Sequence, residues 1–204
     1  MREVMVPRGP DGAGLFQSGA IATGHRRLKI IDLSEHAQQP MLDPELGLGI
    51  VFNGCIYNYR ELRRRLQEQG YRFFSHGDTE VIIKAYHAWG EDCVQQFHGM
   101  FAFAIWERDS GRVFLARDRL GIKPLYLAER DDELLFASEI KGLLAGLPGP
   151  ATFNRDVLPE FLASRYVAGK ETFFEGVHKL LPGHWLSWSP ARGCRTHHYW
   201  EPPF

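Results

Sequence analysis

A series of short strand-like segments in the middle of the chain constrains the fold more than any other feature of the sequence. Polar connections such as Asp109-Ser110-Gly111 and Asp131-Asp132 join these segments, which is typical of antiparallel neighbours in a meander. The stretch Phe101–Trp106 is apolar on both faces, so its sheet should be covered on both sides. We therefore predict an α+β fold with two packed antiparallel sheets flanked by helices. The four segments are Met100–Glu107, Arg112–Arg117, Leu125–Glu129 and Glu133–Ala137.

Further elements are predicted on both sides of this central series. Ala20–Asp32 has the pattern of a long extended segment, and the apolar run Leu48–Phe52 predicts a strand that ends at Asn53-Gly54. An amphipathic helix should follow Asn58, which has Glu61 three residues on as its capping-box partner. The other predicted helices are Thr79–Trp89, Ser138–Ala145 and Asn154–Arg165.

Length, charge and cysteine content limit the classes of protein to consider. The 204 residues suffice for one substantial core, and we expect a main domain over residues 1–180, with residues 181–204 forming an edge element and the start of a linker. A formal charge of −1 argues against nucleic acid as a partner, and no apolar run approaches the roughly 20 residues of a membrane span. Three widely spaced cysteines are typical of the reducing cytoplasm.

Several side chains could bind or transform a ligand. Asn53-Gly54 offers an amide side chain and an accessible backbone N–H, as an oxyanion hole requires, although a plain turn is the alternative. One arginine of the Arg26-Arg27 pair must face inward, where it needs a carboxylate from a ligand or from a structural aspartate. Asp78 either caps the following helix or holds a ligand ammonium group.

The remaining candidates favour a site without metal or nucleotide. Cys55 follows Asn53-Gly54 directly, but no histidine lies near it in sequence, so a buried inert thiol is favoured over a nucleophile. Cys194-x-x-His197-His198 resembles half of a metal site and lacks a second ligand pair, so we expect no metal. The absence of a glycine-rich phosphate loop argues against a nucleotide site of the common types in this chain.

Ordered motifs over nearly the whole chain resemble the glutaminase domain of glutamine-hydrolysing asparagine synthetases, which are class II glutamine amidotransferases. The most specific of them is the stretch Arg117–Tyr126. In chain order the motifs are Arg8–Gly12, Gly24–Asp32, Gln39–Met41, Phe52–Tyr59, Gly77–Val81, Gly99–Phe103, Ala116–Tyr126 and Phe136–Lys141.

The resemblance implies an N-terminal-nucleophile hydrolase fold, a four-layer αββα sandwich of two antiparallel sheets. It also implies hydrolysis of glutamine to glutamate and ammonia, without a cofactor in this chain. The ammonia would pass to a synthetase domain or subunit that uses ATP and Mg²⁺ to convert aspartate to asparagine. By position, the Asn53 side chain and the Gly54 N–H would form the oxyanion hole, Arg27 would bind the glutamine α-carboxylate, and Asp78 would bind its α-ammonium.

Two departures from the family pattern affect these expectations. The position of Cys55 normally holds a glutamate that helps to bind the substrate amino group, and a neutral thiol cannot supply that charge. Family members begin Met-Cys-Gly-Ile with the nucleophilic cysteine, whereas this chain begins Met1-Arg2, on what reads as the tail of a helix. Because loss of a covalent nucleophile costs on the order of 10⁶ in turnover, we expect the chain by itself to be inactive.

Three interpretations follow from the resemblance. The favoured one is part of an asparagine synthetase-like enzyme of amino-acid biosynthesis, with its true start upstream and its second domain downstream. The second is a non-catalytic, degenerate glutaminase module that binds or scaffolds. The third is the glutaminase domain of an amidotransferase with another acceptor. The sequence leaves the oligomeric state open, a homodimer included.

Overall fold

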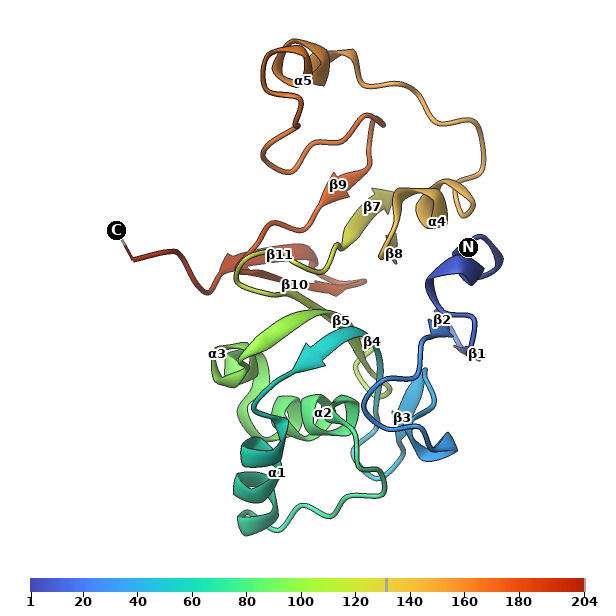
Figure 1. The fold of residues 1–204 in the computed structure, drawn as a ribbon. Coiled ribbons are helices and arrows are strands. Elements are labelled where there is room, and N and C mark those ends of the chain that lie inside the picture. The colour runs from blue at the N-terminus through green and yellow to red at the C-terminus, as the bar shows by residue number, and fades with distance from the viewer. Residues whose placement is uncertain (131, 204) are drawn as a thin grey trace.

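A six-stranded antiparallel sheet forms the centre of the protein, whose computed structural model describes residues 1–130 and 132–203 (Figure 1). Its strand order is β11-β10-β6-β5-β4-β3, and the long pair β4 and β5 runs in register from Leu48↔Glu107 to Ile56↔Gly99. The strands are β3 (Met41–Asp43), β4 (Leu48–Ile56), β5 (Gly99–Glu107), β6 (Val113–Arg117), β10 (His184–Ser189) and β11 (Gly193–His198).

Two smaller antiparallel sheets cover one face of this large sheet. One is the hairpin of β1 (Gly12–Ser18) and β2 (Ile21–Arg27). The other has the order β8-β7-β9, with β7 (Tyr126–Arg130), β8 (Glu133–Ala137) and β9 (His178–Lys179). Both pack on the same apolar cluster of the large sheet, the hairpin through Phe16 and Ile21 and the second sheet through Leu134 and Phe136. The second layer of the sandwich is therefore built in two pieces.

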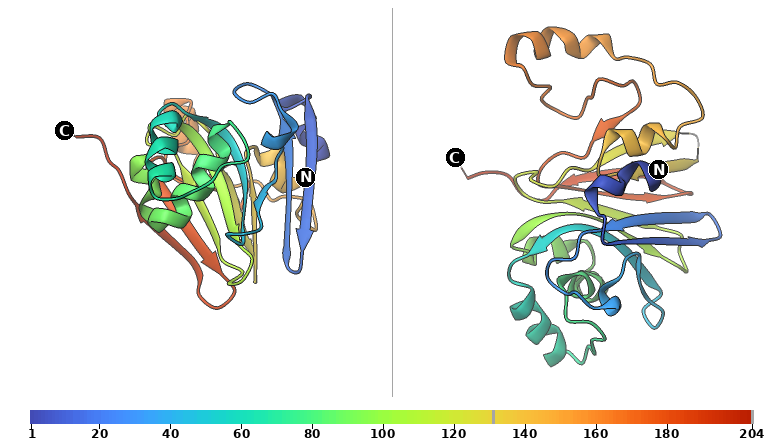
Figure 2. Two further views of the ribbon diagram at one scale, coloured as in Figure 1. Left: turned by 90° about the horizontal axis from the view of Figure 1, so that it is seen from below. Right: turned by 45° about the vertical axis from the view of Figure 1, so that its right-hand side comes forward.

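Helices lie outside both layers. Helices α1 (Tyr59–Glu68), α2 (Asp78–Trp89) and α3 (Cys93–Gln96) cover the other face of the large sheet, and α4 (Ile140–Leu144) packs on β7 and β8. The left view of Figure 2 shows helices, large sheet and hairpin as successive layers. Helix α5 (Leu158–Ser164) projects beyond β9 (Figure 1). The short 3₁₀ helices are η1 (Glu3–Arg8), η2 (Glu35–Ala37), η3 (Gly90–Asp92) and η4 (Arg155–Val157).

The apolar core follows the alternation of side chains along β4 and β5. Phe52 and Phe103 point to the helical side, where they join a cluster with α1 and α2, while Val51 and Ala104 point to the second layer. Both faces of the central strands are thus buried, which confirms the prediction made from the doubly apolar stretch Phe101–Trp106. Among the described residues, no helix is long and apolar enough to cross a membrane.

Several predicted elements are correct, but the predicted meander is wrong. Strand β8 and helix α2 lie where the pattern placed them. However, β5 and β6 belong to the large sheet, whereas β7 and β8 form a hairpin in the second layer. The connection after β7 includes Asp131, which lies outside the described residues, as does Phe204 at the end of the predicted linker.

Local capping differs from the sequence prediction in two helices. Asn58 is the N-cap residue of α1, yet its side chain makes no cap hydrogen bond. Its amide instead donates to Gln96 O at 2.9 Å and accepts from His98 N at 3.0 Å, which ties α1 to the segment before β5. The N-cap of α2 is Gly77, so the interpretation of Asp78 as a cap is wrong.

Three strand assignments also change. Asn53-Gly54 does not follow β4 as a turn but lies inside it, opposite Ala102 and Phe101. Strand β2 ends at Arg27, and residues 28–34 form a loop. The stretch 181–204 contributes β11 as the sheet edge, but β10 lies inside the sheet and buries Trp185 and Leu186.

Candidate functional site

A row of backbone amides along β4 provides the framework of the site. Phe101 exchanges hydrogen bonds with Asp118, so Gly54 opposite Phe101 is a non-hydrogen-bonded pair and its N–H points away from β5. Phe52 N and Ile56 N point the same way, and they donate to Gln39 Oε1 at 2.6 Å and to Asp78 Oδ2 at 2.9 Å. Between these two, the Gly54 N–H has no partner among the described residues.

The absence of a side chain at Gly54 is a requirement of the packing. A Cβ at this position would lie 2.2 Å from Met100 O and 2.8 Å from Phe101 Cα, well inside any tolerated contact. The neighbouring Asn53 lies opposite Ala102, whose side chain belongs to the cluster between the two layers. An amide side chain and a free N–H therefore leave β4 from adjacent residues, an arrangement that can stabilise an oxyanion.

Asp78 is a buried carboxylate at the first turn of α2. Its side chain is 4% exposed, and burial raises its pKa above the usual range, although hydrogen bonds from Ile56 and the first amides of α2 act in the opposite direction. None of the ion pairs among the described residues includes Asp78. A buried carboxylate without a counter-ion is stabilised by a cation, so the site can take a ligand ammonium group.

Arg27, the last residue of β2, is a buried guanidinium at 7% exposure. It donates to Ser34 O at 3.0 Å and to Asp32 O, both of them backbone carbonyls. No carboxylate lies within ion-pair distance of it in the described part of the chain, which leaves the alternative of a structural aspartate partner unsupported. Since a guanidinium has five N–H groups, donors remain for a ligand carboxylate.

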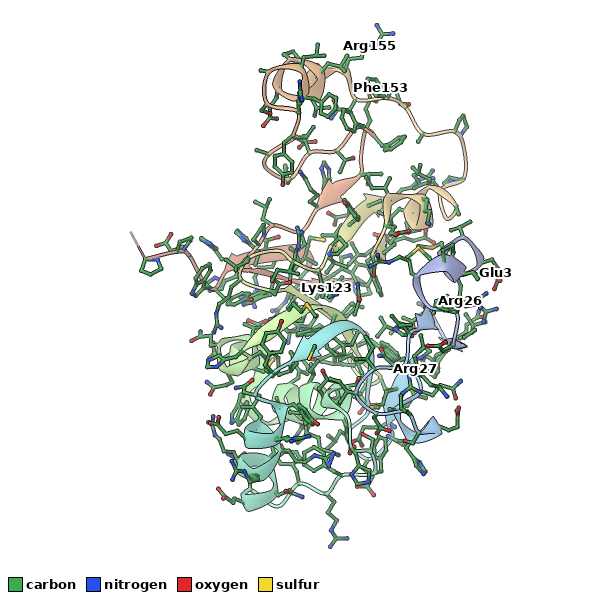
Figure 3. The ribbon with its side chains drawn as sticks, in the orientation of Figure 1. Glu3, Arg26, Arg27, Lys123, Phe153 and Arg155 are labelled. Atoms are coloured by element: carbon green, nitrogen blue, oxygen red, sulfur yellow. The ribbon has the colours of Figure 1, made fainter. Side chains whose placement is uncertain are left out.

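Arg26 shows that the two faces of β2 differ. Its guanidinium points to the periphery and pairs with Glu3 at 2.5 Å, and the two residues lie close together beside η1 in Figure 3. Figure 3 also labels Arg27, where β2 leads into the 28–34 loop. The prediction that one member of the pair faces inward is confirmed, and that member is Arg27.

Three residues that the sequence interpretation missed connect these parts. His25, two residues before Arg27, donates through Nε2 to Phe52 O at 3.1 Å, and burial lowers its pKa to about 4, so its ring is neutral near pH 7. Gln39 binds the amide of the same residue, Phe52. Asp32 accepts from His76 N at 2.9 Å, two residues before Asp78. All three lie in motifs of the family resemblance, Gly24–Asp32 and Gln39–Met41, but the motifs by themselves assigned them no role. Asp32 also has a local signal, the Asx-turn pattern Asp32-Leu33-Ser34.

Cys55 lies next to Gly54 but is poorly suited to attack a substrate. Burial raises the pKa of its thiol, the nearby Asp78 carboxylate raises it further, and Lys123 acts in the opposite direction. The other cysteines lie elsewhere: Cys93 is fully buried in α3, and burial raises the pKa of Cys194 in β11 to about 12. The expectation of an unreactive thiol agrees with this direction of the pKa, but Cys55 is only partly buried, so the expectation of a buried thiol is wrong.

A hydrogen-bonded loop supports the site from the side of β5. The Asp118 carboxylate, 1% exposed, accepts from the amides of Phe101, Leu120, Ile122 and Lys123. Arg117 donates to three carbonyl oxygens, which belong to Gly121, Lys123 and Leu180. This network holds the 118–123 loop beside the strand that pairs with Gly54.

The structure thus brings Asn53, Gly54, Cys55 and Asp78 together through β4 and the start of α2, and it links Arg27 to them through the 28–34 loop. Two cavities lie away from these residues. They have volumes of about 290 and 320 Å³ and open at the opposite end of β4, where Gly47 and Leu48 line both. Neither is lined by a residue of the predicted site.

Comparison with known proteins gives consistent matches. Residues 1–200 match a family model described as a glutamine amidotransferase domain. The chain is 36% identical over 204 residues to "Asparagine synthetase [glutamine-hydrolyzing] 3" of Bacillus subtilis (strain 168), covering 98% of this chain and 33% of that protein. It is 35% identical to "Amidase chry2" of Gibberella zeae, covering 98% of this chain and 29% of that protein. The chain therefore spans about a third of the length of these curated relatives.

A solved structure has the same fold. Glutamine phosphoribosylpyrophosphate (PRPP) amidotransferase from B. subtilis, complexed with ADP and GMP, matches with a TM-score of 0.61 and 20% identity, covering 89% of this chain and 35% of that one. The mixed α/β architecture with antiparallel sheets is thus the one expected from the resemblance, an N-terminal-nucleophile hydrolase-type sandwich.

Proposed function

We propose a function from the fact that this chain belongs to the glutamine amidotransferase domain family. It is a glutaminase domain that binds L-glutamine at Arg27, Asp78 and the Asn53-Gly54 pair. One observation carries the proposal: two buried groups of opposite charge, Arg27 and Asp78, lack counter-ions in the described part of the chain. The head group of an α-amino acid supplies a carboxylate for the first and an ammonium for the second.

The roles of the other residues follow from the chemistry of amide hydrolysis. When a nucleophile attacks the side-chain amide of glutamine, the carbonyl oxygen becomes an oxyanion, and donors aimed at that oxygen lower the barrier. The unpaired Gly54 N–H and the Asn53 side chain are donors of this kind. Cys55 would contact the substrate without supplying a charge, because burial and the Asp78 carboxylate both raise its pKa.

The thiols of this chain do not form part of the proposed catalytic step. Each of the three cysteines is free, and burial raises the pKa of every one of them. A thiol that stays protonated is a poor nucleophile. We therefore propose that the chain alone binds glutamine without releasing ammonia from it, and that a nucleophile from outside these residues is needed for turnover. Free thiols also favour work in the cytoplasm.

The names of the relatives support a proposal for the acceptor of the ammonia that the complete enzyme would release from glutamine. An asparagine synthetase-like protein is favoured, in which a further domain or subunit would bind ATP and Mg²⁺ and would aminate aspartate, with no cofactor needed by this chain. The relative whose name is an amidase favours, as a second candidate, an amidotransferase with another acceptor. A purely scaffolding module would not need two buried charges without counter-ions.

Calorimetric titration of the chain tests the binding function. We expect L-glutamine to bind with one-to-one stoichiometry and D-glutamine not to bind, because exchange of the α-substituents removes either the carboxylate or the ammonium from its partner. Absence of L-glutamine binding, or equal affinity for the two enantiomers, would contradict the proposal.

A further inference from the structure

Asp32 lies in the 28–34 loop and joins the two charged groups of the proposed glutamine site. Its backbone oxygen accepts a hydrogen bond from Arg27, whose other terminal nitrogen binds Ser34 O at 3.0 Å. Its carboxylate reaches the other side of the site: Oδ2 accepts from His76 N at 2.9 Å. The same residue is thus bonded to Arg27 through its backbone and to the start of α2 through its side chain.

The contact with α2 is close. Gly77, the N-cap residue of α2, follows His76, and a Cβ on Gly77 would lie 3.4 Å from Asp32 Cβ. Asp78 comes next and binds Ile56 N at the end of β4. A continuous path therefore leads from Arg27 through Asp32 to Asp78 and the strand that carries Gly54.

We propose that Asp32 is a positioning residue that sets the separation of Arg27 and Asp78, so that one α-amino acid head group can bind both. This inference rests on the proposed function and extends it to a residue that does not itself contact the ligand. Arg27 is the last residue of β2 and Asp78 is the first residue of α2, so a bond between the segments next to them holds the two charges at one separation.

A purely local role for Asp32 would need only one of its two carboxylate oxygens. Oδ1 accepts from Ser34 N at 2.9 Å, which closes an Asx turn within the loop itself. Oδ2 makes the bond to His76, 44 residues away in sequence, and this second bond has no part in the local turn.

The electrostatics of Asp32 fit a fixed bridge. Although partial burial by itself would raise the pKa of Asp32, hydrogen bonds from Ser34 and His76 lower it to about 2. The carboxylate is therefore ionised throughout the neutral range, and hydrogen bonds to an ionised acceptor are the stronger kind.

The test compares the affinities of the parent and an Asp32 variant for ligands that can bind Arg27, Asp78 or both. The variant Asp32→Asn keeps a single acceptor oxygen, so its side chain can no longer accept from both Ser34 N and His76 N, and Asp32→Ser keeps an oxygen that reaches only the local turn. The ligands are L-glutamine, glutaramate, which lacks the ammonium, and 4-aminobutanamide, which lacks the carboxylate. Affinities are measured by NMR titration, with Glu35→Gln as a matched control, because Glu35 is a nearby exposed carboxylate that pairs with Lys29.

We expect Asp32→Asn to weaken L-glutamine binding by about tenfold or more. The two single-charge ligands should change by about twofold at most, since the separation of the charges does not affect them. Glu35→Gln should leave all three affinities unchanged. Amide hydrogen exchange at His76 should become faster in Asp32→Asn. If Asp32→Asn does not fold, Asp32→Ser, which keeps only the local turn, should show the same loss of L-glutamine affinity and the same faster exchange at His76.

Other results would overturn the inference. Equal weakening of all three ligands would show that Asp32 has a general structural role, and unchanged L-glutamine affinity would show that it does not set the separation. Unchanged exchange at His76 would remove the bridge itself. If the parent chain does not bind L-glutamine at all, the proposed function fails and this inference fails with it, whereas binding that is insensitive to Asp32 overturns the inference alone.

Discussion

The carboxylate of Asp78 accepts a hydrogen bond from the backbone N–H of Ile56 at 2.9 Å, which joins the first turn of α2 to the end of β4. This contact places a buried negative charge two residues from Gly54, whose N–H stays unpaired among the described residues. The geometry of the proposed site depends on this contact, because it fixes Asp78 of α2, the group for the substrate head, against β4, the strand that carries the donor for the reacting amide.

Gly54→Ala should destabilise the fold, because the added Cβ would lie 2.2 Å from Met100 O in the facing strand. Overpacking of this kind costs about 1–3 kcal/mol in free energy of unfolding. Urea unfolding measures the effect. Gly149→Ala is the matched control, since a Cβ there meets nothing within 4 Å. Equal unfolding free energies for the two variants would show that β4 and β5 do not approach as described.

The pH dependence of glutamine binding should report the ionisation of Asp78. Burial raises the pKa of this carboxyl above the usual range, so the group takes up a proton at a higher pH than an exposed aspartate does. Only the ionised form attracts the ammonium. Affinity should therefore fall as the pH is lowered through this raised pKa, and it should be constant above it until the ammonium group of the ligand loses its proton.

The control for this dependence is Asp78→Asn, which keeps an oxygen for Ile56 N but carries no charge. Its affinity for L-glutamine should be weaker and nearly independent of pH over the same range. The raised pKa of Asp78 also affects the free energy of unfolding. Because the folded protein holds the proton more tightly than the unfolded chain does, the contribution of Asp78 to stability decreases as the pH rises through that pKa. A pH profile shared by the parent and the variant would assign the titration to another group.

A buried ion pair on the helical side should contribute strongly to stability. Lys84 Nζ lies 2.8 Å from Asp43 Oδ2 and 3.3 Å from Glu80 Oε1, and all three side chains are buried. Lys84→Ala leaves the buried Asp43 carboxylate without its cation and leaves Glu80 with only the Arg63 guanidinium, 3.9 Å away, which should cost about 3–5 kcal/mol. Chemical denaturation provides the measurement. Lys29→Ala, which removes an exposed pair with Glu35, should cost about 1 kcal/mol or less.

The raised pKa values of the three thiols allow a prediction for an activity assay on the chain alone. With pKa values raised by burial, none is a ready nucleophile, and incubation with L-glutamine should release no ammonia above the background rate. Cys55→Ser should give the same result as the parent. Ammonia release by the parent that is lost in Cys55→Ser would show instead that Cys55 attacks the substrate.

Local patterns in the sequence predicted much of the fold. Apolar periodicity located α1 and α2, and turn residues separated β5 from β6 and β7 from β8. The distribution of strands between sheets was not predictable in this way. Strand β6 pairs with β5 through a short connection, but its other neighbour is β10, about 70 residues further along the chain. This second pairing is set by long-range packing of Trp185 and Leu186.

The site was predicted in its residues but not in its connections. The inward position of Arg27 followed from strand alternation, whereas the end of β2 at that residue depends on bonds from its guanidinium to the loop that follows. Asn53-Gly54 has the composition of a turn, yet pairing with β5, more than 40 residues away, keeps it extended. The bridge from Asp32 to His76 joins segments whose contact no local pattern indicates.

The most direct test of the proposed site compares adjacent arginines. Arg27 is buried and has no carboxylate partner within ion-pair distance in the described part of the chain, whereas Arg26 pairs with Glu3 at the periphery. In calorimetric titrations with L-glutamine, the parent and Arg26→Ala should show the same one-to-one binding, and Arg27→Ala should show at least a tenfold loss of affinity. Equal affinity in Arg27→Ala and the parent would contradict the assignment of the α-carboxylate to Arg27, and with it the central claim.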